Sequence, residues 1–382
     1  MLTVLLQDSS SRARRRARIV LAWADGQDTF EIARALHSRT LRIRQVTNAF
    51  QEKRLEIFSR AALKRAPNPP PKKAAREIPP LTAQSSMRAA ARQILAQQFS
   101  KLERVESAVR AGQDTEAVHD MRVACRRMNS ALRLFKNFLP NKRVKKLRPV
   151  LEQLRDTLGA ARNLDVLGAD LDAYAANVSD AERAQLHLIR DAWVHERAVQ
   201  QNALRALLDS AAFQTWRERM ETFLDEQDAG SSPRVTDMLP ALLWKQYGAV
   251  RAYETRLQDA ALEELHALRI DIKRLRYTLE FFADAFDGKP NELLEPLIAL
   301  QDQLGWMQDA VVAGQALTDF IVTHARQAQE QHAPLADFQA LAAYHAHLRN
   351  RIQETRVRLP EQCLPVTNSA YRERLAERTA RL

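Results

Sequence analysis

Two histidines, each followed by a row of basic residues, are the side chains of this sequence best suited to bind anions. The first row, after His119, consists of Arg122, Arg126, Arg127 and Arg133. The second row, after His266, consists of Arg269, Lys273, Arg274 and Arg276. Arginine donates two parallel hydrogen bonds to phosphate oxygens and keeps its charge, and lysine adds a compact charge. Two such rows indicate binding of a phosphate-bearing polyanion.

Helical spacing places each row on one face of a helix. At about 100° per residue, Arg122, Arg126 and Arg133 lie within about 60° of His119, and Arg127 flanks them. The opposite face is apolar and carries Met121, Ala124, Cys125, Met128, Leu132 and Phe135. The second segment repeats this division, with an apolar face of Leu268, Ile272, Leu275, Leu279 and Phe282. Because like charges on one helix face repel each other, the repetition favours a polyanion ligand over an ordinary solvated surface.

Other polar residues near the rows receive weaker assignments. Further candidates for polyanion binding are Lys142, Lys145, Lys146, Lys245 and Arg251. His119 and His266 could be structural residues near helix starts or pH-sensitive anion contacts, since a free imidazole titrates near ~6.5. Neither histidine is followed by a second ligand three or four residues later, so we predict no metal site. Asp165 and Asp309 are interpreted as caps or partners of the arginines, without a catalytic role.

The composition predicts an almost wholly α-helical fold, since glycine is scarce, with 9 in 382 residues, and helix-forming residues dominate. A second pair of segments also matches: LEQLRDTLGAARNLD from Leu151 and IALQDQLGWMQDA from Ile298. Their shared Leu158-Gly159 and Leu304-Gly305 are interpreted as turns. A repeat of this length predicts two similar helical bundles of about four helices each.

Proline and charge divide the chain. Prolines crowd residues 66–80, which predicts an extended linker between a basic unit, 1–65, and a long helical module, 81–382. The module divides into halves 81–230 and 231–382. Most of the net charge of +11 lies in the first 80 residues. A polyanion site in the module must therefore arise from local segregation of charge.

The repeated motifs resemble those of the CHAD family, the conserved histidine α-helical domain, over residues 81–382. The resemblance rests on HDMRVACRRM with LGAARNLD in one half and HALRIDIKRLRY with LGWMQDA in the other. It implies two pseudo-symmetric four-helix bundles around a central basic groove that binds inorganic polyphosphate, and association with polyphosphate granules. The two histidines and the eight basic residues of the rows would then contact the ligand. Asn129 stands where the second motif has Arg276, which implies a weaker hold by the first half.

Residues 12–65 resemble the helix-turn-helix opening of transposase-type proteins. The pattern predicts a helix from Arg15 to Ala24, a turn at Gly26, a helix over 30–36 and a recognition helix over 40–54. Arg39, Arg42 and Arg44 would open that last helix, where recognition residues enter the major groove of DNA. The alternative is a basic helical appendage that assists polyanion binding or pairs with another chain.

Three functions remain open from the sequence. The first is polyphosphate binding, the second a DNA-binding regulator or architectural protein, and the third a phosphate-handling enzyme or a phosphohistidine carrier using His119 or His266. No Walker-type loop, ExExK signature or paired-carboxylate site occurs, so we predict neither catalysis nor a cofactor. No apolar run approaches the ~18–20 residues needed to span a bilayer. We therefore expect a cytoplasmic protein without a membrane partner.

Overall fold

The structure is a computed structural model that describes residues 15, 18–20, 22–23, 27, 29–36, 38, 40–53, 80–112, 114–226, 231–286, 288, 290–332 and 337–382. The chain divides into two compact units, Met1–Glu77 and Ile78–Leu382. Within the described ranges the regular elements are helices, apart from an isolated antiparallel bridge between Ser86 and Arg234. The predicted all-α fold class is confirmed. The linker over 66–80 lies outside the described residues, except for Pro80.

The described part of the first unit contains α3 (Thr29–Ala35) and α4 (Thr40–Lys53), and residues 18–20 and 22–23 are also helical. Its small core consists of Ile19, Ile32, Ala33 and Ile43, against which Val46 packs. Gly26, where a turn is predicted, lies outside the described residues. The helices α3 and α4 agree with the predicted ranges.

The second unit is built from two successive halves. The first half contains α5 (Met87–Ala111), α6 (Thr115–Leu134), α7 (Asn141–Ala175), α8 (Asp180–Asp209) and α9 (Ala211–Asp225). The second contains α10 (Val235–Arg251), α11 (Leu262–Phe281), α12 (Asn291–Gln331), α13 (Gln339–Thr367) and α14 (Ser369–Ala380), with a short η3 (Ala283–Ala285). Single residues, Ser210 and Asn368, separate the last two helices of each half and cap the second of them. In the described residues each half therefore has five α-helices, where the sequence predicted about four.

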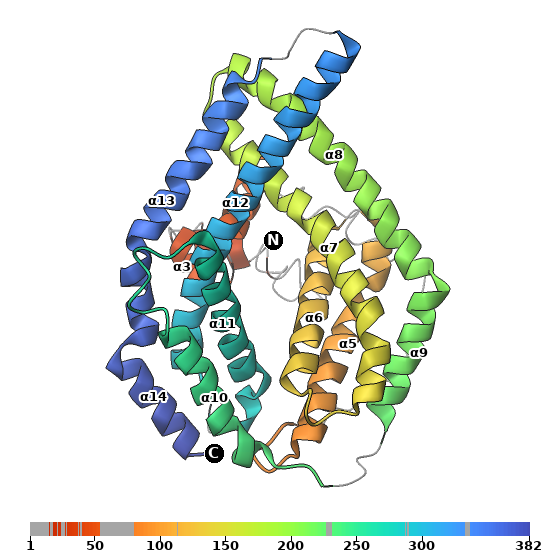
Figure 1. Cartoon of the computed structure of the whole chain (residues 1–382), viewed down its shortest axis with the longest axis vertical. Helices are drawn as coiled ribbons and strands as arrows, with labels where there is room; N and C mark the ends of the chain where they lie inside the picture. The colour runs from red at the N-terminus through yellow and green to blue at the C-terminus, as the bar shows by residue number, and fades with distance from the viewer. Residues whose placement is uncertain are drawn as a thin grey trace. The chain divides into compact units, whose positions relative to one another are not determined.

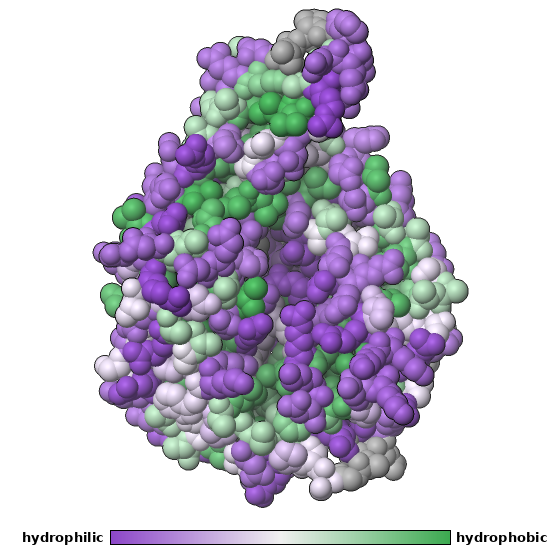
Figure 2. All heavy atoms as spheres, viewed as in Figure 1, coloured by the Kyte–Doolittle hydropathy of each residue, from purple (hydrophilic) through white to green (hydrophobic). Residues whose placement is uncertain are grey.

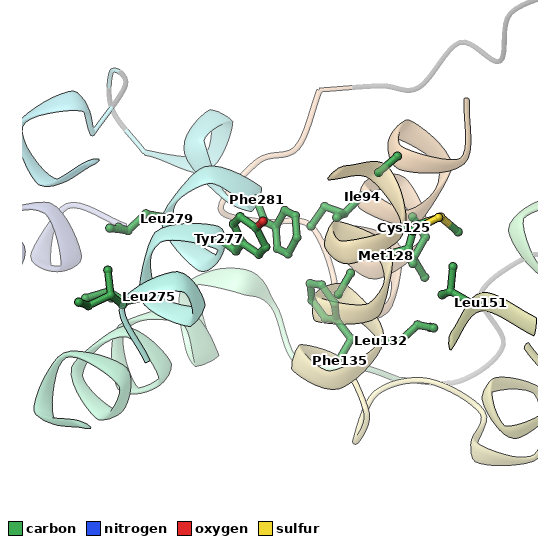
Figure 3. Packing of buried hydrophobic residues seen from close by; sticks show 14 of the residues in the cluster. Ile94, Cys125, Met128, Leu132, Phe135, Leu151, Leu275, Tyr277, Leu279 and Phe281 are labelled. Atoms are coloured by element: carbon green, nitrogen blue, oxygen red, sulfur yellow. The ribbon is translucent and has the colours of Figure 1, made fainter. Parts of the chain in front are cut away.

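The helices α6 and α11 each bury the face predicted to be apolar. The side chain of Asp114 accepts hydrogen bonds from the backbone of Glu116 and Ala117 and so caps the start of α6. Figure 3 shows Cys125 and Met128 on the packed side of α6, and Leu275 and Leu279 on the far side of α11. The residues listed for both apolar faces are buried. This burial turns the opposite, basic faces away from the core.

The predicted turns at Leu158-Gly159 and Leu304-Gly305 are wrong, because both lie inside the long helices α7 and α12. Glycine in a helix interior costs only about 0.5–1 kcal/mol relative to alanine. Burial of the flanking leucines, which are 0% and 1% exposed, outweighs that cost. The two glycines consequently serve packing.

The two halves touch at both ends (Figure 1). At one end Met87 donates a backbone hydrogen bond to Pro233, and the rings of Phe135 and Phe282 lie 5.8 Å apart. These phenylalanines occupy equivalent positions of the two motifs. At the other end α7 and α8 meet α12 and α13, and the Tyr344 hydroxyl donates to Asp170 at 2.8 Å.

Candidate functional site

The two basic faces come together around Lys273. This half-buried lysine lies on α11, and the cations that act on it are Arg269 and Arg274 of the same helix and Arg126 and Arg133 of α6. Burial first, and then these four arginines, lower the pKa of Lys273 to about 7. Cations from two halves of the sequence therefore share one environment. We call these five residues the basic cluster.

Two helix glycines hold arginines of the rows. A Cβ at Gly305 of α12 would lie 3.4 Å from Nη2 and 3.5 Å from Nε of Arg269. A Cβ at Gly159 of α7 would lie 3.8 Å from Nε of Arg122. Each guanidinium thus rests against the backbone of the next helix, at equivalent places in both halves. Only glycine leaves this surface free of a side chain.

Figure 2 shows hydrophilic residues around a hollow near the middle of the face drawn in Figure 1. The neighbouring helices are long and regular, so the arginines sit on rigid supports. Rigid positioning is what a binding site needs, because less side-chain freedom is lost when a ligand binds.

Arg127 and Arg276 take part in a different contact, which joins the two halves. Arg127 forms an ion pair with Glu280, and Nε of Arg276 lies 3.5 Å from Oε1 of the same carboxylate. The three side chains are only 17–18% exposed. Arg127 also lies over the rings of Tyr277, at 5.2 Å, and Phe281, at 5.1 Å. The sequence predicted both arginines as ligand contacts, whereas in the structure both contact Glu280. We call Arg127, Arg276 and Glu280 the Glu280 seam.

Asn129 and Arg276 occupy equivalent positions of the two motifs, and neither belongs to the basic cluster. Asn129 is buried and donates a hydrogen bond to the carbonyl of Cys125 at 3.1 Å. Arg276 belongs to the Glu280 seam. The difference between these two positions therefore leaves the residues of the basic cluster unchanged.

The two histidines differ in their surroundings. His266 is exposed, and its Nδ1 lies 2.8 Å from Oε1 of Gln308 on α12. His119 is half-buried on α6 and also interacts with a neighbouring group. Gln308 was not singled out from the sequence, although it follows Gly305 by one helical turn. In the described part of the chain, no three His, Cys, Asp or Glu residues form a metal-binding group.

Several weaker candidates lie outside the basic cluster. Lys142, Lys145, Lys146 and Lys245 are exposed. Arg251 pairs with Glu254 at 2.9 Å. Asp165 lies within α7, so it is not a helix cap. It forms an ion pair with Arg197 of α8 at 2.8 Å, and Arg197 is not one of the arginines of the two rows. Asp309 lies within α12 and is also engaged with a neighbour.

The candidates for DNA contact lie in the first unit. Arg44 is exposed on α4, and Arg42 is half-buried and interacts with another residue. Arg39 lies outside the described residues. DNA binding through these arginines stays a prediction.

Fold and site together define a two-lobed, all-helical module with a cluster of cations contributed by both lobes. The model of the CHAD domain family matches residues 93–318, more than half of the chain. The chain belongs to the CHAD domain family. The resemblance of residues 12–65 to a helix-turn-helix lies outside the matched range.

Solved structures share this fold. The CHAD domain from the plant Ricinus communis is 26% identical, with a TM-score of 0.55, covering 78% of this chain and 95% of that chain. PptA from Streptomyces chartreusis is 17% identical, with a TM-score of 0.55, covering 73% of this chain and 99% of that one. No curated protein matches the chain. None of the described helices is long and apolar enough to cross a membrane.

Proposed function

We propose that the chain binds inorganic polyphosphate in a groove between its two halves, with the phosphates contacting the basic cluster. The observation that carries this proposal is the convergence of Arg126 and Arg133 with Lys273, although they belong to different halves. Gathering cations in a half-buried place is unfavourable, as the lowered pKa of Lys273 reflects. A bound polyanion offsets this repulsion. Membership of the CHAD family supports the same ligand.

A linear ligand suits the site better than a single phosphate. From Arg122 to Arg133 the first row extends along about 17 Å of helix, at about 1.5 Å per residue. Successive phosphates of one chain can contact successive cations, and each further contact forms at high effective concentration. This arrangement provides binding without a catalytic group.

The test is a titration of fluorescently labelled polyphosphate into the full chain. A cluster variant carries Arg126→Ala, Arg133→Ala, Arg269→Ala and Lys273→Ala. A control variant loses four exposed arginines outside the cluster, through Arg219→Ala, Arg349→Ala, Arg358→Ala and Arg372→Ala. Both variants lose four basic residues, so their comparison separates the site from general attraction.

We expect the cluster variant to lose at least 100-fold in affinity while keeping its helical circular dichroism, because each contact to a charged group contributes about 1.5–3 kcal/mol. The control should lose much less. Equal losses in the two variants would contradict the groove.

We also propose that this binding places the chain at polyphosphate granules in the cytoplasm. A fluorescently tagged chain should colocalise with the granules, and the tagged cluster variant should remain diffuse. Granule association of both proteins would assign it to another part of the chain, such as the basic residues before 80.

A further inference from the structure

The basic face of α11 also carries a carboxylate. At about 100° per residue, Glu280 lies within about 40° of Arg269 and Lys273 around the helix. The equivalent position of the first motif is Arg133, a member of the basic cluster. The basic face of α6 therefore ends in a cation, whereas that of α11 ends in an anion.

Glu280 lies between two arginines that come from different halves. Arg127 of α6 forms an ion pair with it, and Nε of Arg276 lies 3.5 Å from its Oε1. Both guanidinium groups also pack on aromatic rings. Arg276 lies 5.1 Å from the ring centroid of Tyr277, and Arg127 lies 5.1 Å from that of Phe281. These contacts hold two cations at fixed positions around the Glu280 carboxylate.

The Glu280 seam contains more positive charge and more donors than its carboxylate satisfies. Two arginines and one glutamate leave a net charge of +1. The Nε atoms of Arg127 and Arg276 are buried, and neither has a hydrogen-bond partner among the described residues. Most buried polar groups in proteins are paired, so this excess calls for an explanation.

Glu280 supplies the two arginines with the kind of oxygen that a phosphate would supply. Guanidinium groups bind carboxylates and phosphates in the same way, with parallel N–H donors facing two oxygens. The carboxylate is tethered to α11, so it meets Arg127 and Arg276 at high effective concentration and without the loss of freedom that accompanies ligand binding. A phosphate of a free chain therefore competes poorly for these two arginines.

We propose that Glu280 is an internal substitute for a phosphate, and that it ends the polyphosphate path along α11. This inference rests on the proposed function, because it assigns the limit of the same groove. The ligand contacts the basic cluster and stops before Arg127 and Arg276, although both arginines belong to the rows. Glu280 thus determines how strongly, and over what length, the ligand is held.

The test removes the internal anion by Glu280→Ala in the full chain. Alanine suits a helix and opens space beside the two guanidinium groups. We expect the affinity for fluorescently labelled polyphosphate to rise at least tenfold, because two further arginines then contact phosphates. The slope of log affinity against log salt concentration should become steeper by about 1.4–1.8, since each arginine contributes about 0.7–0.9. An affinity or a slope equal to that of the wild type would overturn the proposal.

Two control variants separate an occupied place from a general change of charge. Glu280→Gln removes the same charge and keeps the space filled, so its affinity should stay near that of the wild type. Glu292→Ala deletes the carboxylate that pairs at 2.6 Å with Arg378, an arginine outside both rows, and should give no comparable gain. Equal gains in the three variants would reveal a general charge effect and contradict the assigned place.

Replacing the arginines of the Glu280 seam as well tests whether they produce the gain. A variant with Arg127→Gln, Arg276→Gln and Glu280→Ala, checked by circular dichroism, should lose the gain of Glu280→Ala. A gain that persists without these arginines would place the added phosphate contact elsewhere and refute the inference.

Inorganic phosphate provides a second measurement, which does not need a long ligand. Glu280→Ala should unfold at a lower temperature than the wild type, because Arg127 and Arg276 lose their shared carboxylate. A phosphate bound in the vacated place stabilises the folded state. Compared with sodium chloride at the same ionic strength, phosphate should therefore raise the melting temperature of Glu280→Ala more than that of the wild type. Equal shifts in both proteins would count against the proposal.

The titrations distinguish this inference from the proposed function. A wild type that does not bind polyphosphate would sink the proposed function and this inference together. A wild type that binds polyphosphate, with no gain on Glu280→Ala, would sink this inference alone.

Discussion

Replacing Lys273 by methionine should stabilise the fold and weaken polyphosphate binding in one and the same protein. Methionine keeps the unbranched shape and removes the charge. In the native protein the charged amine is half-buried among four arginines, which disfavours its protonated form. The variant therefore relieves a repulsion that only a ligand would otherwise offset.

The magnitude follows from the pKa of Lys273, which falls from 10.5 to about 7. If the unfolded chain titrates normally, such a difference corresponds to at most about 5 kcal/mol. Solvent access and relaxation of the flexible side chain reduce the expected gain to about 1–3 kcal/mol. The unfolded state binds the extra proton between pH 7 and 10.5. Native stability consequently rises with pH across this window, and the gain from Lys273→Met should be largest below pH 7 and shrink toward pH 10.

Urea denaturation at pH 6.5 and pH 9.5, followed by circular dichroism, measures this gain. Lys273→Arg is the matched control, because it keeps a charge that does not titrate in this range. It should show no stabilisation at either pH. A Lys273→Met protein that is less stable than the wild type at pH 6.5, or equally stabilised at both pH values, would refute the reasoning.

The same variants test binding. Lys273→Met should bind polyphosphate about 10- to 100-fold more weakly at pH 6.5, since it loses one contact to a charged group. The wild type should also bind more weakly as pH rises above 7, because the ligand must then restore a proton to Lys273. Lys273→Arg should bind with little dependence on pH in that range. Fluorescence titrations at fixed ionic strength between pH 6.5 and 9 measure all three.

Three further changes have defined outcomes. Glu280→Gln should lower the free energy of unfolding by about 1–3 kcal/mol in a urea titration, because Arg127 and Arg276 lose their shared half-buried carboxylate. Its polyphosphate affinity should stay the same, and unchanged stability would argue against the Glu280 seam. Gly305→Ala should raise the free energy of unfolding by about 0.5–1 kcal/mol and leave polyphosphate binding intact. Gly305→Leu should displace Arg269 and weaken binding at least tenfold in the fluorescence titration. Equal binding by the two variants would refute the role of Gly305 in positioning Arg269. The logarithm of the polyphosphate affinity should fall with the logarithm of the salt concentration with a slope near −4, because five cations each contribute about 0.7–0.9 to the slope. A slope near zero would exclude electrostatic binding by the basic cluster.

Local periodicity was sufficient to predict which faces of α6 and α11 are buried. The burial of Met121, Cys125 and Met128 follows from their spacing, because a helix presents every third or fourth residue to the same neighbour. The two matching motifs likewise predicted two helical halves. These are properties of short segments, and they do not depend on where the segments lie in the fold.

Arg126 and Arg127 show where that reasoning ends. They are adjacent in the chain, and helical projection placed both on the basic side. In the structure Arg126 acts on Lys273, whereas Arg127 pairs with Glu280. The difference depends on how α11 approaches α6, which brings together residues about 150 positions apart.

The sequence by itself determined the helical fold and the residue types suited to a polyanion, since each is encoded within one helix or one motif. Its repeated motifs also predict two similar halves. Only the tertiary structure decided that Lys273 lies between two rows of arginines, that Gly305 provides a surface for Arg269, and that Glu280 engages two predicted ligand residues. The physical reason is that charge state, burial and ion pairing depend on distances between helices. Helical periodicity defines directions around one axis and leaves the spacing between axes to the packing of the whole module.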